Sequence, residues 1–198
     1  LRIAGAAYWM DFSNQQFFLF SNGIQALVNA DASRIKGFEL EAHARPVEGW
    51  TIDAGINVLD ASLRELGNFP GPVSSADVNG NDLPFVPETA FNISSQYERP
   101  IFNGNAEAFA RVDWARYGRI FWAVTNRLDQ SQAAYSLINL RAGVRVDNWT
   151  FAVFAENVAD KRYDTFCFSS QFISSPLGVD PCFDGTPRRW GVEASARF

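Results

Sequence analysis

The sequence has few of the residue types that enzymes use for catalysis, and it has no long apolar run. Its 198 residues include one histidine, two cysteines and one methionine. No serine or cysteine is placed in the sequence to use His43, so we interpret this histidine as a solvated polar residue. A transmembrane helix needs about 20 consecutive apolar residues, and no segment approaches that length. The sequence therefore predicts neither an enzyme nor a helical membrane protein.

Positive charge is also scarce, because the 17 Lys and Arg residues are outnumbered by 22 Asp and Glu residues. Nucleic-acid binding requires a concentrated basic surface, so this class of partner is excluded. Segment 77–82 is rich in oxygen ligands, but Gly80 occupies the fourth position of the loop, where calcium loops need glycine at the sixth. We expect neither a metal site nor a cofactor.

Apolar and polar residues instead alternate with a period of two along most of the chain, which is typical of half-buried β-strands. In the last strand, for example, Trp190, Val192 and Ala194 share one face, while Glu193 and Ser195 share the other. We interpret residues 13–32 mostly as an excursion out of the sheet. Eight strands are predicted, at 3–12, 33–45, 50–58, 88–99, 105–117, 134–146, 149–160 and 187–198.

The connections between these strands alternate between short and long. Residues 46–49, 100–104 and 147–148 are short turns, whereas 63–86, 118–133 and 161–186 are long loops. Outer-membrane barrels have short periplasmic turns and longer extracellular loops. The pattern therefore favours an all-β fold, an antiparallel transmembrane β-barrel of about eight meander strands. A soluble β-sandwich binding module and a complete eight-stranded barrel with a structural or adhesive role remain as alternatives.

In a barrel, the polar face of each strand lines the lumen, and aromatic residues near the strand ends form girdles at the membrane interfaces. The predicted girdle residues are Trp50, Tyr97, Trp114, Trp149 and Phe198. The predicted lumenal charges are of both signs: Glu39, Glu41, Asp53, Arg111, Asp113, Arg141, Arg145, Glu193 and Arg197.

Both cysteines lie in the last long loop, where they are either two free thiols or a disulfide. A disulfide between Cys167 and Cys182 is favoured because the rest of the chain avoids cysteine. Cross-linking a loop of this size is worth roughly 3 kcal/mol in the chain-entropy model.

Aromatic and cationic residues of two long loops are the candidate ligand contacts. Such side chains suit aryl, acidic or ferric-chelate ligands through stacking and cation–π contact. The alternative is that they pack the loops together and, through arginine, contact lipopolysaccharide. The candidates are Arg119, Trp122, Arg127, Arg162, Tyr163, Phe166, Phe168, Phe172 and Phe183.

Several short segments, in this order and spacing, resemble the barrel domain of TonB-dependent outer-membrane receptors. They are Gly37-Phe38-Glu39-Leu40-Glu41, Gly80-Asn81-Asp82-Leu83-Pro84, Tyr135-Ser136-Leu137-Ile138-Asn139-Leu140-Arg141-Ala142-Gly143, Glu156-Asn157-Val158-Ala159-Asp160-Lys161-Arg162-Tyr163 and Gly185-Thr186-Pro187-Arg188-Arg189. The resemblance runs from about Tyr8 to the end of the chain.

This resemblance implies a 22-stranded barrel in the bacterial outer membrane that encloses an N-terminal plug and takes up ferric siderophores or similar scarce nutrients. Residues 1–198 would be a C-terminal fragment that supplies the last eight strands and lacks the plug. The implied partners are outer-membrane lipid and lipopolysaccharide, the ferric siderophore or other nutrient, and TonB, which contacts the missing N-terminal part. A further implied partner is the barrel assembly machinery, which reads Phe198. The last strand either closes on residues 3–12 or remains an exposed edge.

Overall fold

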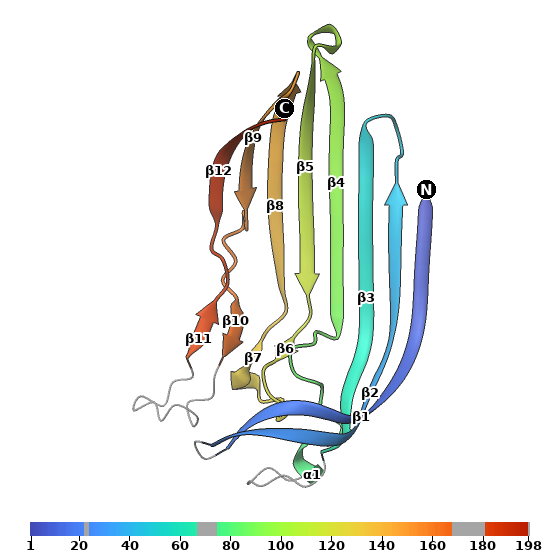
Figure 1. The fold of residues 1–198 in the computed structure, drawn as a ribbon, viewed down its shortest axis with the longest axis vertical. Helices are drawn as coiled ribbons and strands as arrows, with labels where there is room; N and C mark the ends of the chain where they lie inside the picture. Colours follow the sequence, from blue (N-terminus) through green and yellow to red (C-terminus); the bar gives the residue numbers. More distant parts are fainter. Residues whose placement is uncertain (22–23, 67–74, 168–180, 198) are drawn as a thin grey trace.

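The computed structural model describes residues 1–21, 24–66, 75–167 and 181–197. Eight strands form one antiparallel sheet in the order β1-β2-β3-β4-β5-β8-β9-β12 (Figure 1). Each of them pairs with the wall strand before and after it in the chain, so the predicted eight-stranded meander is confirmed. The wall strands are β1 (Arg2–Ser21), β2 (Ile24–Ala44), β3 (Trp50–Glu65), β4 (Thr89–Ile101), β5 (Ala106–Tyr117), β8 (Tyr135–Val146), β9 (Trp149–Glu156) and β12 (Arg189–Ala196).

The long connections contain short elements of their own, all near one end of the sheet (Figure 1). Two small hairpins form there, β6 (Ile120–Phe121) with β7 (Ser131–Gln132) and β10 (Asp164–Cys167) with β11 (Cys182–Asp184). Short helical turns also occur in these connections, at α1 (Ser75–Val78) and η2 (Leu128–Gln130). A further one, η1 (Phe102–Gly104), forms the short turn between β4 and β5 at the opposite end of the sheet (Figure 1). Among the described residues, no helix has both the length and the apolar character needed to cross a membrane.

The sheet is open, with β1 at one edge and β12 at the other. Within the described residues β12 pairs with β9 and β1 pairs with β2, so the chain does not close on itself. The described strands therefore do not form the closed eight-stranded barrel that was the first alternative. They do not form the second alternative, a sandwich, either, because a sandwich needs two sheets packed face to face and these eight strands form a single wall.

Residues 13–32 do not leave the sheet, contrary to expectation. β1 and β2 remain paired as far as Ser21 opposite Ile24, and this long hairpin bends across the loop end of the sheet (Figure 1). β3 likewise continues to Glu65, beyond its predicted end at Val58. The strands extend because their ends bury an apolar cluster of their own.

That cluster is made of fully or nearly fully buried side chains at the loop end of the wall. Phe17 and Ala30 of the β1–β2 hairpin contribute to it, and Leu63 and Leu66 are 0% and 1% exposed. Ala61 of β3 also belongs to it, and the connecting loops supply Val78, Leu83 and Val124. Its members come from four separate segments, so the loop end of the wall has a small hydrophobic core.

Between the turns and this core, strand register assigns each side chain to one of two faces, because directly paired residues share a face. On one face Leu40 lies opposite Ile56 and Phe38 opposite Val58. On the other, His43 lies opposite Asp53. Five of the six tryptophans also lie on the apolar face: Trp9, Trp50, Trp114, Trp149 and Trp190.

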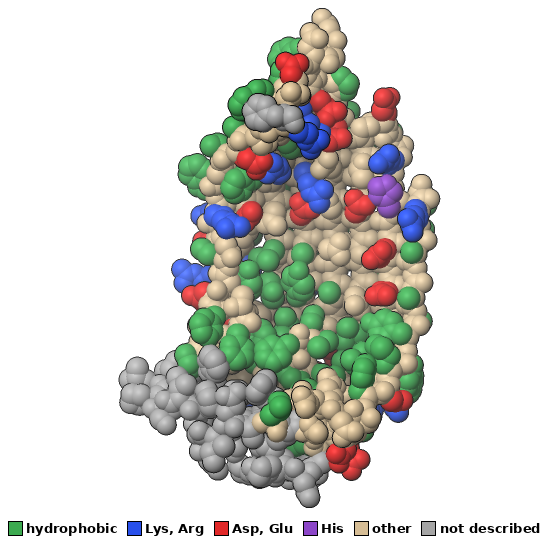
Figure 2. All heavy atoms as spheres, viewed as in Figure 1, with side chains coloured by type: hydrophobic (Ala, Val, Ile, Leu, Met, Phe, Trp, Pro, Cys, Tyr) green, Lys and Arg blue, Asp and Glu red, His purple; other side chains and the backbone are tan. Residues whose placement is uncertain are grey.

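The apolar face is therefore the lipid-facing one, and the polar face lines the lumen. Figure 2 looks at the lumenal face, where charged side chains and the single histidine occupy the half near the short turns. Hydrophobic side chains gather in the half near the long loops.

The short turns are tight enough to demand particular backbone conformations. Gly49 has φ of +78°, and a Cβ there would lie 2.0 Å from the carbonyl oxygen of Glu98. Only glycine fits this turn between β2 and β3. The predicted two-residue turn between β8 and β9 is confirmed, with Asp147 at φ of +49°.

Candidate functional site

Four aromatic rings from three different connections meet at the loop end of the wall. Phe85 lies 5.8 Å from both Trp122 and Phe166, measured between ring centroids. Trp122 lies 6.3 Å from Phe166, and Phe166 stacks on Phe183 at 6.4 Å. We call Phe85, Trp122, Phe166 and Phe183 the aromatic cluster.

Backbone hydrogen bonds fix the position of each member. The amide of Phe85 donates to the carbonyl of Phe121 at 2.9 Å, which ties the loop before β4 to the β6–β7 hairpin. Within that hairpin, the amide of Trp122 donates to the carbonyl of Gln130 at 3.0 Å. Phe166 and Phe183 lie opposite each other in the β10–β11 pair. Main-chain pairing therefore positions the cluster before any ligand binds.

The cluster combines exposed aromatic faces with one unsatisfied polar group. Phe85 and Phe183 are 56% and 58% exposed, whereas Trp122 is 8% exposed. The indole Nε1 of Trp122 is buried and has no hydrogen-bond partner among the residues that the structure describes. A buried N–H without an acceptor costs about 1–3 kcal/mol, so an acceptor brought by a bound molecule would recover that cost.

The cluster unites three of the nine predicted ligand residues, Trp122, Phe166 and Phe183. Phe168 and Phe172 lie outside the described residues. Sequence reasoning missed Phe85, which lies among the prolines and glycines of a predicted loop. The only available signal was its position as an aromatic residue between Pro84 and Pro87.

The arginines among the predicted contacts have partners of their own. Arg119 donates from Nη1 to the hydroxyl of Ser131 at 3.0 Å. Arg127 forms an ion pair with Asp129, and its hydrogen bond lowers the pKa of the Asp129 carboxyl. Arg162 is exposed. Arg119 and Arg127 thus help to shape the β6–β7 loop.

Tyr163 packs into the scaffold beside the cluster. Its ring stacks on Tyr135 with centroids 4.6 Å apart and planes 13° from parallel. A Cβ on Gly185 would lie 2.2 Å from the Tyr163 ring, so the glycine lets the chain pass close over it. The packing of Tyr163 on Tyr135 and Gly185 supports the alternative of loop packing at this position.

Asn157 joins the two ends of the connection between β9 and β12. Its side-chain amide donates to the carbonyls of Lys161 and Thr186 at 2.9 and 3.0 Å, and its Oδ1 accepts from the Lys161 amide at 2.8 Å. It is 4% exposed and has φ of +47°. Asp160 accepts from the amide of Arg188 at 3.1 Å, so the two sequence segments 156–163 and 185–189 lie side by side.

Cys167 and Cys182 are joined by a disulfide at the end of the β10–β11 pair. Asp164 lies close to both sulfurs. Because both sulfurs are bonded to each other, neither is a thiolate ligand for a metal ion.

The polar segment near Asp82 serves to join two extracellular loops. Asn81 donates to the carbonyl of Val124 at 2.8 Å, and the amide of Asp82 donates to Asn126 Oδ1 at 2.7 Å. Burial, together with the charges of Glu88 and Asp60, raises the pKa of the Asp82 carboxyl.

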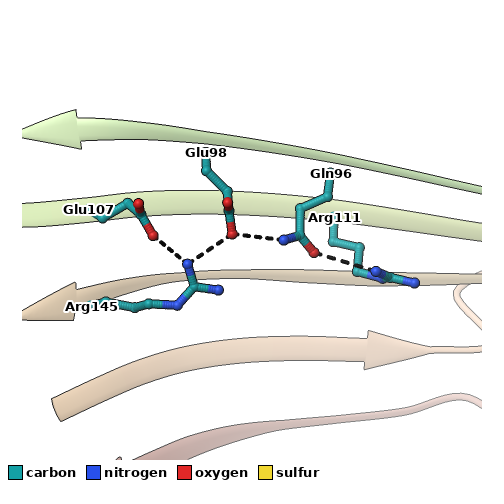
Figure 3. Close-up of polar contacts among 5 residues, drawn as sticks. All are labelled: Gln96, Glu98, Glu107, Arg111 and Arg145. Carbon is teal, nitrogen blue, oxygen red and sulfur yellow. Dashed lines mark hydrogen bonds and ion pairs between the residues drawn. The ribbon is translucent and has the colours of Figure 1, made fainter. Parts of the chain in front are cut away.

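Charged side chains on the lumenal face are paired along the wall (Figure 3). Arg145 donates to Glu98 at 2.8 Å and also to Glu107. The side-chain amide of Gln96 donates to Glu98 at 2.8 Å, and its oxygen accepts a hydrogen bond from Arg111 at 3.4 Å. Further along the face, Arg111 forms hydrogen bonds with Asp113. Arg141 donates to both carboxylate oxygens of Glu193 at 3.0 Å. His43 forms a hydrogen bond with Asp53. This arrangement gives a polar wall whose charges largely neutralise each other.

The chain matches the family described as TonB dependent receptor-like, β-barrel, over residues 1–158. Over 155 residues it is 23% identical to a probable TonB-dependent siderophore receptor, PiuA, of Acinetobacter baumannii. The aligned region covers 76% of this chain and 20% of that protein. The chain therefore spans about a fifth of the length of this curated relative.

Solved structures show the same fold. The ferric yersiniabactin uptake receptor FyuA from Yersinia pestis superimposes with a TM-score of 0.77 at 20% identity, covering 97% of this chain and 27% of that one. The crystal structure of PiuA from Acinetobacter baumannii gives 0.69 at 21% identity, with 97% and 25% covered. The copper transporter OprC gives 0.69 at 18% identity, with 99% and 28% covered.

Proposed function

The chain belongs to the TonB-dependent receptor-like β-barrel family, and on this premise we propose that it forms part of the barrel of a receptor that takes up a ferric siderophore or similar nutrient. Proteins of this family are outer-membrane barrels, so the eight-stranded wall lies in the bacterial outer membrane. The family consists of receptors and transporters, and we assign this chain no catalytic role.

The observation that carries the proposal is the aromatic cluster. It is placed by main-chain bonds at the extracellular end, it exposes the rings of Phe85 and Phe183, and it contains the unpartnered Nε1 of Trp122. Flat aromatic surfaces bind aryl groups by stacking, and the indole N–H suits an oxygen acceptor. A ferric chelate with aryl ligands offers both features. Arg162, Phe168 and Phe172 remain proposed contacts, as does the rest of the predicted set.

The remaining assignments rest on the family and are part of the proposal. Residues 1–198 would be a C-terminal piece of the barrel domain, and TonB would act on a part of the protein outside this chain. Glu39 and Glu41 face the lumen and make no ion pair with another described residue, which suits contact with a further, enclosed domain. We further propose that the barrel assembly machinery recognises Phe198, which lies outside the described residues.

The test is uptake of iron by the full protein that carries this chain, expressed in a strain without its own ferric-siderophore receptors. We expect one or more of a panel of catecholate, phenolate and hydroxamate ferric siderophores to deliver ⁵⁵Fe only when TonB is present. Replacing Trp122 with alanine should weaken binding of that chelate about tenfold, since stacking and one hydrogen bond are lost.

The matched control is Phe102→Ala, which removes a 75% exposed aromatic ring at the opposite end of the wall. It should leave both binding and uptake unchanged. Uptake of no chelate in the panel would contradict the proposed function. Uptake with unchanged affinity in Trp122→Ala would contradict the assignment of the aromatic cluster alone.

A further inference from the structure

Two residues at the aromatic cluster have backbone conformations in the left-handed region. Phe85 has φ of +67° and Asn126 has φ of +50°. Asparagine is enriched in this region, whereas a bulky aromatic residue at positive φ is a genuine outlier. Strain of this kind persists only where the surrounding structure holds the backbone in place. The contacts around Phe85 therefore include the groups that hold it.

The side chain of Asn126 binds the backbone of the loop that carries Phe85. Its Oδ1 accepts from the amide of Asp82 at 2.7 Å, and its Nδ2 donates to the carbonyl of the same residue at 3.0 Å. One side-chain amide thus exchanges two hydrogen bonds with one residue, as a neighbouring antiparallel strand would. The carbonyl of Ala123 accepts from Nδ2 at 3.3 Å and from the backbone amide of Asn126 at 3.2 Å. These bonds fix the side chain within its own turn.

This attachment lies close to two members of the aromatic cluster. In one loop Asp82 precedes Phe85 by three residues, and in the other Asn126 follows Trp122 by four. At the other end of segment 82–85, the amide of Phe85 donates to the carbonyl of Phe121 at 2.9 Å. The segment is therefore bonded to the second loop at both of its ends. Of these two attachments, only that of Asn126 uses a side chain, so a substitution can remove it.

The exposure of Phe85 shows why hydrogen bonds are needed to hold it. Its ring is 56% exposed, so burial of apolar surface supports the strained backbone only in part. Its ring contacts are with Trp122 and with Phe166, each at 5.8 Å between centroids, and ring pairs of this kind contribute modestly. The attachment at Asn126 therefore helps to hold the ring, whose exposed face is open to a flat group of a bound molecule.

We propose that Asn126 is a positioning residue of the ligand site, and that its amide holds the Phe85 ring in place for stacking with an aryl group of the bound ferric chelate. The inference rests on the proposed function, because it takes the aromatic cluster as the ligand site. Asn126 acts through the backbone of Asp82 and Phe85 and not by contact with the ligand. Chelates that carry aryl rings should therefore depend on Asn126, and chelates of aliphatic hydroxamates should not.

The first measurement is hydrogen exchange of the full protein that carries this chain, without ligand. Asn126→Gly retains easy access to positive φ and removes every side-chain hydrogen bond. The amides of residues 82–85 should then exchange about tenfold faster. The matched control is Asn103→Gly, because Asn103 has φ of +56° and is exposed at the opposite end of the wall. Unchanged exchange in Asn126→Gly, or equal acceleration in Asn103→Gly, would contradict the positioning role.

The second measurement is binding of the aryl chelate that the unaltered protein takes up. Asn126→Gly should weaken this binding about fivefold, and it should have no further effect in a Phe85→Ala background, where no ring is left to position. Additive losses would mean that Asn126 only stabilises the loop, and would overturn the proposal.

An aliphatic ferric hydroxamate serves as the ligand control. An equal loss of its binding in Asn126→Gly would also overturn the proposal, because this chelate has no aryl group to stack on Phe85. Binding of no chelate by the unaltered protein would contradict the proposed function. Failure of the exchange or coupling result would instead contradict the role of Asn126 alone.

Discussion

The two halves of β3 have opposite polarity patterns. From Trp50 to Val58, the lipid-facing residues are apolar, including Ile52 and Ile56, and the lumenal residues are polar, including Asp53. Beyond Asp60 the pattern reverses. There Asp60, which lies opposite Lys36, is on the outward side, and Arg64 is exposed at an irregularity in the strand pairing, while Leu63 is fully buried in the extracellular core.

β1 and β2 reverse at the same level. On β2, Phe38 and Leu40 face lipid, but Lys36 and Arg34 follow on that side. The difference shows that one continuous strand serves two environments, lipid around the wall and water around a small conventional core. The row of Trp9, Lys36 and Asp60 therefore marks the outer boundary of the membrane.

The largest effect is expected from Leu63→Ala, which removes a 0% exposed side chain from the extracellular core. Large-to-small changes in such cores cost about 2–5 kcal/mol. Hydrogen exchange of the full protein should show this loss as faster opening near residues 61–66 and 75–83, with the wall unchanged. Leu128→Ala, at a 70% exposed position, is the matched control and should change nothing. An equal effect of both changes would mean that no extracellular core exists.

The assignment of the lipid-facing and lumenal sides of the wall is tested by placing a charge on each side. Ile56→Arg puts a cation into lipid and should cost up to about 4 kcal/mol of barrel stability. Glu41→Arg puts the same side chain on the lumenal face and should cost less than about 1 kcal/mol. Denaturant unfolding in lipid vesicles measures both changes. Similar costs at the two positions would contradict the assignment of faces.

Asn157→Ala extends the comparison to the connection between β9 and β12, whose two ends are joined by hydrogen bonds of this side chain. The change removes three side-chain hydrogen bonds from a buried position and should cost about 1–3 kcal/mol in local opening. Asn103→Ala is the matched control for the backbone cost, because Asn103 has a similar φ of 56° and is exposed. Hydrogen exchange of residues 157–167 should accelerate only in the first variant, and equal exchange in both would rule out the bonding role.

The smallest expected effect is a dependence on pH near Asp82. Because the folded state raises the pKa of this carboxyl, the protonated form stabilises the loop; this contribution is fully present below the ordinary pKa of 3.8 and is lost as the pH rises through the folded pKa. Asp82→Asn should therefore slow opening of residues 75–83 at pH 7, by less than about 1 kcal/mol, and give no gain near about pH 3.

Asp129 provides the opposite control, since Arg127 lowers its pKa. Its contribution is present above the ordinary pKa of 3.8 and is lost as the pH falls through the folded pKa. Asp129→Asn should therefore speed opening of the β6–β7 loop at pH 7. If both changes shifted exchange in the same direction, the assigned electrostatic environments would be wrong.

Alternation and loop length were enough to predict the wall, because a two-residue period and the order of short and long connections are both properties of the sequence. They were not enough for residues 13–32. On β1 both faces are largely apolar near the boundary, with Tyr8 and Met10 on the lumenal side and Ala7 and Trp9 on the other. The alternation of residues along β1 therefore does not show that the polarity of the two faces reverses there. The aromatic cluster was found in part, from composition. Phe85 was missed because it is placed by its hydrogen bond to Phe121, across a separation that no local pattern encodes.

The reversal of polarity at the membrane boundary is the central claim, and a spin-label scan along β3 tests it most directly. Single labels from position 51 to position 64 of the full protein in lipid vesicles are compared for collision with oxygen, which partitions into lipid, and with a water-soluble nickel chelate. At positions 52–58 we predict that even-numbered labels favour oxygen and odd-numbered labels favour nickel. At positions 60 and 64 even-numbered labels should favour nickel, and at 61 and 63 odd-numbered labels should be shielded from both. A pattern that keeps the same phase from position 51 to position 64 would contradict the account.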